Sequence, residues 1–437
     1  MERAKLIVKN FGPLKDIEIE VREMVTFIGA QASGKSTLAK LISIFEDESF
    51  RRDDAVSFED ELKKYKIFNY LKENTYISYN NSKSSLNYCA FKYENEKHLK
   101  YNSLYWLDSF KKNNDSADLF ALKIVLNIEL NTLIFKYPKR IEKFVNFFKN
   151  NFNVKELVSY LHLSKFKKNH VNIDEIFEIL GIKQIITNYF SFYEDIIKIF
   201  PEVYTCDSLY IPAERNFLHI IAENTLGLIN NNVQIPKHLL NSGQDYEKAL
   251  QKIKKLPLSI IDKKIKYQRE GKTSYIYHNE NEKVDLLESA SGLQSIVPVL
   301  LLVEYAKSLR DKYNFNFVVE EPELNLYPKA QHELIKYLVA NCLEDRKNLI
   351  LTTHSPFVLA SLNNLLLAYD KGQTKPKEVS KTIKKESWLN PKNFIAYQLK
   401  NGKAYKIMDD KLGQIKENMI DSVSDSFSDE FSKLLDL

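Results

Sequence analysis

The chain has 437 residues, of which 44% are apolar and 28% are charged. This length and balance exclude a single small domain and predict a globular protein with a large core and one or two subdomains. The formal net charge of +5, from 63 basic and 58 acidic residues, permits a nucleic-acid partner but does not by itself indicate one.

The cysteine content and the apolar runs bear on the compartment. The three cysteines, Cys89, Cys206 and Cys342, lie far apart without a CxxC pair, which favours a reducing compartment and gives no sign of structural zinc. The residues after Met1 are charged, and the longest apolar run, 296–303, is too short to span a membrane. We therefore expect a cytoplasmic protein with no membrane partner.

The N-terminal residues predict three strands and a helix. Residues 5–9 and 17–21 alternate between apolar and polar side chains around Asn10-Phe11-Gly12-Pro13, a pattern typical of two antiparallel strands joined by a turn. The apolar run 25–28 predicts a buried strand, and residues 36–45 predict a helix that begins directly after a loop.

The loop between this strand and helix fits the phosphate-binding pattern G-x-x-x-x-G-K-[ST]. Its residues are Gly29, Ala30, Gln31, Ala32, Ser33, Gly34, Lys35, Ser36 and Thr37. Glycines allow backbone N–H groups to turn towards phosphate oxygens, and the helix N-terminus adds the positive end of its dipole. We expect Lys35 to reach the β- and γ-phosphates, Ser36 to bind Mg²⁺, and Thr37 to lie near the α-phosphate. The loop therefore predicts nucleotide binding.

The middle of the chain divides into two regions. Residues 75–101 have the pattern of strands, and we place them in an antiparallel lobe beside the nucleotide site. Residues 103–200 are rich in Phe, Leu, Ile, Lys and Asn at helical spacing, which predicts a helical insertion. Its lysines fit a solvated helical face better than a DNA-binding surface. We thus expect a nucleotide-binding domain in two parts, 1–101 and 201–437, with an inserted α-helical domain at 102–200.

The C-terminal half predicts further strands and helices. A strand at 209–211 precedes a polar loop, and 256–266 and 273–278 form a hairpin across 270–272. A helix begins near Ser291, and the tail holds a hairpin around Asn401-Gly402 and a final helix with apolar residues at Phe427, Phe431, Leu434 and Leu435. The fold class is α/β, with a mixed sheet.

Two apolar strands in this half end in polar side chains. Residues 315–319 are followed by Glu320 and Glu321, and residues 349–353 by His354. In doubly wound sheets such strand tips meet at the crevice that binds ligands. Hydrolysis of a γ-phosphate needs Mg²⁺ and an oriented water. We therefore predict that Glu320 holds the metal's water shell and Glu321 polarises the attacking water, in preference to a solvated acidic turn.

Three further sites remain candidates. A lone histidine is more often structural, but the position of His354 within Thr352–Pro356 at the end of a strand favours a role as γ-phosphate sensor. Ser291-Gly292 offers N–H groups and a hydroxyl to an anion, or forms an ordinary helix cap. Glu214-Arg215 either approaches the active site or forms a surface ion pair.

Two acidic pairs are poor candidates for a metal site. Asp53-Asp54 and Asp409-Asp410 fit turns or solvated surface better than a metal centre.

In this order, the motifs resemble the ABC-class ATPase heads of the OLD-like and RecF/SMC-like group, which includes AAA-type ATPases of bacterial phage-defence operons. The resemblance covers residues 1–101 and 201–437. Its motifs are the opening Asn10-Phe11-Gly12-Pro13, Walker A at Gly29–Thr37, a sequence similar to the ABC signature at Ala290–Gln294, Walker B and the D-loop at Glu320–Pro328, and the switch histidine His354. Glu320 stands where the family has an aspartate, which affects the expected metal geometry and turnover rate.

The resemblance implies a mechanism with ATP and Mg²⁺ as cofactors. Two heads enclose two ATP molecules, and Ser291-Gly292 of one subunit contacts the γ-phosphate held by Lys35 of the other. A homodimer or higher homo-oligomer is therefore implied. OLD-type relatives carry a Toprim nuclease domain, but the residues after His354 hold no acidic nuclease constellation, so we expect a separate effector protein, a nuclease or toxin.

Three functions follow from these expectations. The first is an ATP-gated regulator of a separate effector in phage defence. The second is a RecF-like repair or maintenance ATPase that binds duplex DNA, with an affinity that falls as salt rises. The third is a scaffold that binds ATP without hydrolysing it, for which the glutamate at position 320 is mild support.

Overall fold

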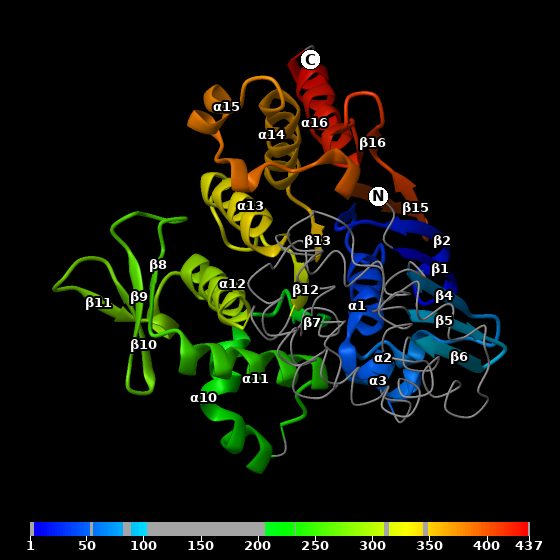
Figure 1. Cartoon of the computed structure of the whole chain (residues 1–437), viewed down its shortest axis with the longest axis horizontal. Helices are drawn as coiled ribbons and strands as arrows, with labels where there is room; N and C mark the ends of the chain where they lie inside the picture. The colour runs from blue at the N-terminus through cyan, green and yellow to red at the C-terminus, as the bar shows by residue number, and fades with distance from the viewer. Residues whose placement is uncertain are drawn as a thin grey trace, which may run out of the picture.

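The computed structural model describes residues 4–52, 56–81, 89–102, 206–231, 233–309, 314–343 and 348–435. The predicted helical insertion at 102–200 lies outside the described residues except for Asn102, and so does the pair Asp53-Asp54. The boundaries 1–101, 102–200 and 201–437 therefore stay a prediction. The described residues form one large sheet with helices around it and a smaller sheet to one side (Figure 1).

An 11-stranded mixed sheet forms the centre of the fold. Its order is β6-β5-β4-β1-β2-β15-β14-β3-β13-β12-β7. The strands are β1 (Ala4–Phe11), β2 (Leu14–Val21), β3 (Met24–Gly29), β4 (Tyr76–Asn81), β5 (Cys89–Glu94), β6 (Lys97–Asn102), β7 (Cys206–Ile211), β12 (Asn314–Glu320), β13 (Asn348–Thr353), β14 (Phe394–Lys400) and β15 (Lys403–Lys406).

The half of the sheet that carries the candidate site is parallel. Strands β14, β3, β13, β12 and β7 lie side by side in one direction. Every residue of β3 and β13 is buried, as expected for strands covered on both faces. The register pairs Thr353 with Ile28 and Glu320 with Thr352, so the carboxyl ends of β3, β13 and β12 meet at one edge. Ligands bind at this edge in such sheets.

The other half of the sheet is largely antiparallel. The β1–β2 hairpin closes at Phe11 and Leu14, and β4, β5 and β6 continue the sheet beyond β1. Alternate residues of β1, such as Leu6 and Val8, are buried, which agrees with the alternating pattern of the sequence. The predicted N-terminal hairpin and antiparallel lobe are confirmed. The α/β class with a mixed sheet is also confirmed.

Several helices pack against the main sheet or against one another beside it. The α-helices of this part of the fold are α1 (Lys35–Glu46), α2 (Glu48–Arg52), α3 (Phe58–Lys64), α12 (Ser291–Ser308), α13 (Pro328–Cys342), α14 (Pro356–Gly372) and α15 (Pro376–Thr382), and the short 3₁₀ helices are η1 (Phe68–Tyr70), η4 (Leu286–Glu288), η5 (Lys385–Ser387) and η6 (Pro391–Asn393). Helix α1 packs against β7, β12 and β13. Its side chain Phe45 stacks on Phe58 and Tyr79, which fixes the helix against the antiparallel lobe.

A second, four-stranded sheet lies beside α12 (Figure 1). It follows helices α10 (Phe217–Asn230) and α11 (Lys237–Lys252), and its strands are β8 (Lys255–Pro257), β9 (Lys266–Glu270), β10 (Thr273–Tyr277) and β11 (Lys283–Asp285). The predicted hairpin across Gly271 is present as β9–β10. The predicted strand 256–266 is wrong in extent, because a turn interrupts it: Ile261 N–H donates to Leu258 O, and the Asp262 carboxylate accepts from Lys264 N–H.

The tail returns to the main sheet and ends in an exposed helix. The β14–β15 hairpin turns at Asn401 and Gly402, as predicted, and the short pair β16 (Met408–Asp409) and β17 (Gln414–Ile415) follows. The final helix is α16 (Met419–Leu435), whose apolar side chains are exposed, Phe427 by 65%. It stands at the rim of the molecule (Figure 1). Among the described helices, none has the length and apolar character needed to cross a membrane.

Candidate nucleotide site

The phosphate loop has the backbone conformation that its glycines allow. Gly34 lies in the left-handed region, with φ of 101°, immediately before α1, and Ala32 has φ of 59°. A Cβ atom at Gly34 would lie 2.4 Å from Leu14 Cδ2, so this position needs glycine for space as well as for conformation. Helix α1 has no capping side chain and no acidic residue in its first turn. Its N-terminus is therefore suited to an anionic ligand.

Lys35 lies inside this loop, with only 4% of its surface exposed. Its Nζ donates to the carbonyl oxygens of Gly29 and Ala30, both at 3.0 Å. Burial lowers the pKa of Lys35, against the raising effect of the carboxylates of Glu321 and Glu323. The ammonium group is thus held by neutral carbonyls beside a cluster of acids, from which phosphate oxygens would draw it into charge-assisted bonds.

Glu320 ends β12 and is only 3% exposed. Burial raises the pKa of its carboxyl group, against a smaller lowering by Lys40 and by the Ser36 hydroxyl. Within the described part of the chain its Oε1 makes no hydrogen bond. A buried carboxylate oxygen next to the Ser36 hydroxyl fits Mg²⁺, which prefers oxygen ligands. Ser36 and Glu320 would therefore hold the ion, as the sequence predicts.

Glu321 and His354 face each other across the ends of β12 and β13. Glu321 Oε1 lies 3.5 Å from His354 Nε2, and both side chains are partly exposed. Burial lowers the pKa of His354 first, Lys35 lowers it further, and Glu321 opposes them. His354 is therefore neutral at pH 7. This brings together the two residues predicted to polarise water and to sense the γ-phosphate.

Glu323 also belongs to the site, although no separate role was predicted for it. Its Oε1 accepts hydrogen bonds from Thr353 Oγ1 and from the backbone N–H of His354, both at 2.8 Å. Burial raises the pKa of Glu323 above its ordinary value, against these bonds. Glu323 thus fixes the backbone from which His354 projects. Its place in a run of acidic residues after a strand was the only signal for it.

Arg215 resolves one of the alternatives left open above. Its side chain is 0% exposed and donates to the carbonyl oxygens of Glu320 and Glu321, both at 2.8 Å, whereas Glu214 is exposed. The surface ion pair is therefore wrong for Arg215, which reaches the end of β12 from the loop after β7.

Ser291 and Gly292 begin α12 on a separate, more open surface. Ala290 is the N-cap residue and no side chain caps this helix, so the ordinary cap is wrong for Ser291, which is exposed. A hollow of about 910 Å³ is lined here by the helix start, by the loop 259–264 and by residues 325–333, including Tyr327. A Cβ at Gly292 would lie 2.7 Å from the backbone oxygen of Asn325, so the residues after Walker B pack directly on this helix start.

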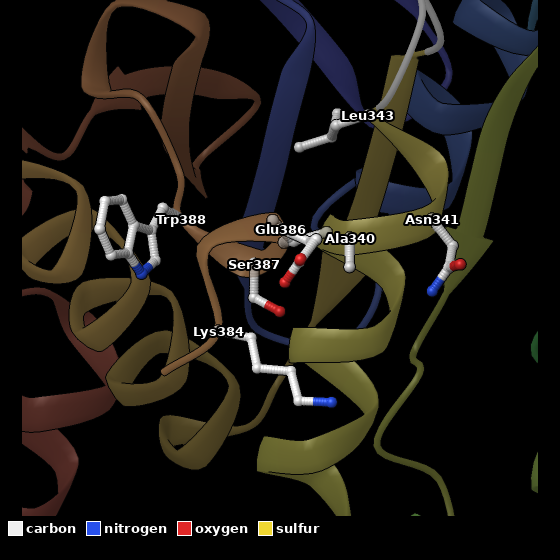
Figure 2. Close-up of a pocket in the computed structure, with 8 residues that line it drawn as sticks. Ala340, Asn341, Leu343, Lys384, Glu386, Ser387 and Trp388 are labelled. Atoms are coloured by element: carbon white, nitrogen blue, oxygen red, sulfur yellow. The ribbon is translucent and has the colours of Figure 1, made fainter. Parts of the chain in front are cut away.

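Two other features lie apart from these surfaces. Asp409 accepts from Lys411 N–H and Leu412 N–H, and Asp410 pairs with Lys406, as expected for a turn. A second hollow of about 520 Å³ lies between the end of α13 and residues 384–388, and Figure 2 shows Lys384, Ser387 and Trp388 along it. No predicted site residue lines this hollow.

A known family accounts for most of the chain. The family model for the AAA ATPase domain (AAA_15) matches residues 1–359, which include the phosphate loop, Glu320, Glu321 and His354. The chain belongs to this family. No curated protein matches the chain. The matched residues thus include β3, β12 and β13, whose ends carry the candidate site, but not β14 and β15.

Solved structures of ATPase heads align along almost the whole AAA ATPase chain, at low identity. The SMC head of Pyrococcus furiosus bound to the C-terminal domain of ScpA has 12% identity and a TM-score of 0.36, covering 93% of this chain and 96% of that one. The SMC head of Thermotoga maritima has 10% identity and a TM-score of 0.37, covering 93% and 98%. The recombination mediator RecF has 15% identity and a TM-score of 0.32, covering 93% and 99%.

Proposed function

We propose that this AAA ATPase domain binds and hydrolyses ATP as an ABC-type head, and that ATP-dependent pairing of two heads gates a partner effector in phage defence. The observation that carries the proposal is the separation of two surfaces on one chain. Lys35, Glu320, Glu321 and His354 meet at one edge of the sheet, whereas Ser291 opens a different, exposed hollow whose lining includes no phosphate-loop residue.

The first surface would carry the hydrolysis itself. Residues 29–37 cradle the phosphates and Lys35 turns from its two carbonyl partners to the β- and γ-phosphates. When Mg²⁺ is held by Ser36 and Glu320, it neutralises charge on the phosphate oxygens. Glu321 orients and deprotonates the attacking water, and neutral His354 contacts the γ-phosphate.

The second surface would complete the site of another copy. Ser291 and Gly292 present a hydroxyl and backbone N–H groups at a helix N-terminus, a set of donors that suits a γ-phosphate. One chain carries one of each surface, so two chains related by a two-fold axis complete two sites. A homodimer, or a higher oligomer built from it, follows.

The placement in phage defence is supported by the resemblance of the motifs to OLD-like heads. A separate nuclease or toxin would read the closing and opening of the heads. RecF-like binding of duplex DNA is the alternative function, and the response of turnover to DNA distinguishes the two.

The test combines ATP turnover with solution mass. Glu321→Gln is expected to lower turnover at least about 100-fold, the scale of a lost general base, and to trap an ATP-dependent dimer or larger assembly. The matched control is Glu378→Gln, an exposed glutamate of α15, which should behave as wild type. Wild-type turnover that rises with DNA supports the RecF-like alternative, and indifference to DNA supports a partner-gated head. Absence of both turnover and ATP-dependent association contradicts the proposal.

A further inference from the structure

Arg215 is a buried cation whose partners are backbone carbonyls. Its guanidinium donates to Glu320 O and Glu321 O at 2.8 Å, and its Nε donates to Ser295 O at 3.0 Å. A fourth, longer bond reaches Pro212 O at 3.4 Å. Burial of a charge is costly unless it is compensated. A guanidinium held in this place by four carbonyls therefore needs a reason beyond packing.

One side of Arg215 fixes the backbone of the candidate catalytic glutamate. Glu321 has φ of 42°, a left-handed conformation that non-glycine residues adopt only when the surroundings enforce it. Its N–H donates to Thr352 O at 2.9 Å and its carbonyl accepts from Arg215. Both peptide groups of Glu321 are thus held, and this conformation directs the carboxylate to His354.

The other side of Arg215 holds the helix that begins with Ser291. Ser295 lies one helical turn after Ser291, and its carbonyl is the acceptor on α12. Pro298 interrupts the hydrogen bonding of the same turn, because proline has no N–H to donate to Gln294 O. This turn of α12 is therefore held from outside, by Arg215, rather than by its own hydrogen bonds alone.

We propose that Arg215 is a positioning residue that couples the surface at Ser291 to the carboxylate of Glu321 within one chain. The inference rests on the proposed function. When Ser291 and Gly292 bind the ATP of a second copy, α12 shifts. Because Arg215 is bonded to both Ser295 O and Glu321 O, this shift moves Glu321, which acts on this chain's own ATP. The two ATP sites of a closed pair are thereby linked.

The first test separates this role from a merely structural one by kinetics. Arg215→Lys keeps the charge but loses the planar fork that reaches four carbonyls. We expect its kcat to fall at least about tenfold, since a displacement near 1 Å can cost about 100-fold, while KM for ATP stays unchanged. Ser291→Ala should lower turnover by a larger factor in the wild-type background than in Arg215→Lys, where the link to Glu321 is already lost.

Two controls distinguish a loss of coupling from a general loss of folding. Lys64→Met removes another buried cation, paired with Glu61 and Asp47 at the far end of α1, and should destabilise the chain without this kinetic pattern. Binding of a fluorescent ADP derivative reports whether the phosphate loop is intact in each variant. A kcat for Arg215→Lys equal to wild type or to Lys64→Met, or effects of Ser291→Ala and Arg215→Lys that simply multiply, would overturn the coupling.

The second test does not depend on turnover. Hydrogen exchange of the chain without nucleotide should speed up in Arg215→Lys at both 291–299 and 321–325, and at neither segment in Lys64→Met. If the wild-type chain hydrolyses no ATP, the proposed function is wrong. The exchange measurement still shows whether Arg215 couples α12 to the segment that contains Glu321. Faster exchange at one of the two segments alone contradicts it.

Discussion

The phosphate-loop edge and the hollow at Ser291 differ in whether their side chains are buried and hydrogen-bonded within a single chain. At the first, Lys35 is buried and held by two carbonyls, and the acids at the end of β12 lie at the same edge of the sheet as His354, which follows β13. At the second, Ser291 is exposed and Tyr327 beside it is 79% exposed. Both surfaces use the same physical device, the N-terminus of a helix without a capping side chain.

The difference shows what kind of ligand each surface is built for. At the phosphate-loop edge the cation is already held in place by backbone carbonyls. The protein groups there are preorganised, so a nucleotide can bind without further ordering of the chain. A surface that leaves donors and an aromatic ring in solvent gains its burial from another molecule. The contrast therefore favours nucleotide binding by a single chain and completion of the site between chains.

The largest expected effect tests the completed surface. Lys35→Ala should weaken binding of ATP about 100-fold, roughly 2.7 kcal/mol, because the charge-assisted bonds to the phosphates are lost. Titration with a fluorescent ATP derivative measures it. The control is Lys63→Ala, an exposed lysine of α3 paired with Asp60, which should bind as wild type. Unchanged affinity in Lys35→Ala would mean that the loop does not bind the phosphates.

The next effect tests the incomplete surface. Ser291→Arg should abolish ATP-dependent association and turnover, because the larger side chain fills the start of the hollow, while a single chain still binds fluorescent ADP as wild type. Solution mass with and without ATP, together with the binding titration, measures both. Loss of ADP binding would instead place Ser291 in the chain's own nucleotide site.

Mixing the two variants sharpens the comparison. In a mixed pair, the Ser291→Arg chain supplies Lys35 and the Lys35→Ala chain supplies Ser291, so one of the two composite sites is intact. We therefore expect partial turnover in the mixture, although neither variant alone is active. An inactive mixture would contradict completion of the site between chains.

Local sequence patterns were sufficient for the parts of the fold that depend on neighbours in the chain. The β1–β2 hairpin, the phosphate loop and the acidic end of β12 each follow from spacing within a few residues. The position of β14 does not, since it pairs with β3, which lies hundreds of residues earlier. Nothing in the β14–β15 hairpin itself indicates that it joins the parallel strands to the antiparallel lobe.

The sequence predicted a site residue only where that residue belongs to a recognisable motif. Lys35, Glu320, Glu321 and His354 stand in recognisable motifs, and the structure brings them to one edge. Arg215 acts on backbone carbonyls of distant strands and helices, so its burial could not be read from Glu214-Arg215. The same holds for Glu323, whose partners lie on β13 and just after it.

The smallest expected effect concerns the protonation of His354. Burial and Lys35 lower its pKa below the ordinary 6.5. As the pH falls below 6.5, His354 therefore binds a proton in the unfolded chain before it does so in the folded chain. His354 therefore adds to stability above pH 6.5, and this contribution is lost as pH falls through the folded pKa. If the neutral ring contacts the γ-phosphate, kcat/KM should stay level from pH 8 to 6.5 and then decline by about tenfold per pH unit below the folded pKa.

His354→Gln distinguishes this titration from others in the chain. Glutamine keeps a hydrogen-bond donor and does not titrate, so the variant should be slower than wild type and should lose the acid limb of the kcat/KM profile. His278→Gln, at an exposed position after β10, should keep both the rate and the limb. An acid limb that persists in His354→Gln would assign the titration to another group and would contradict this role of the His354 ring.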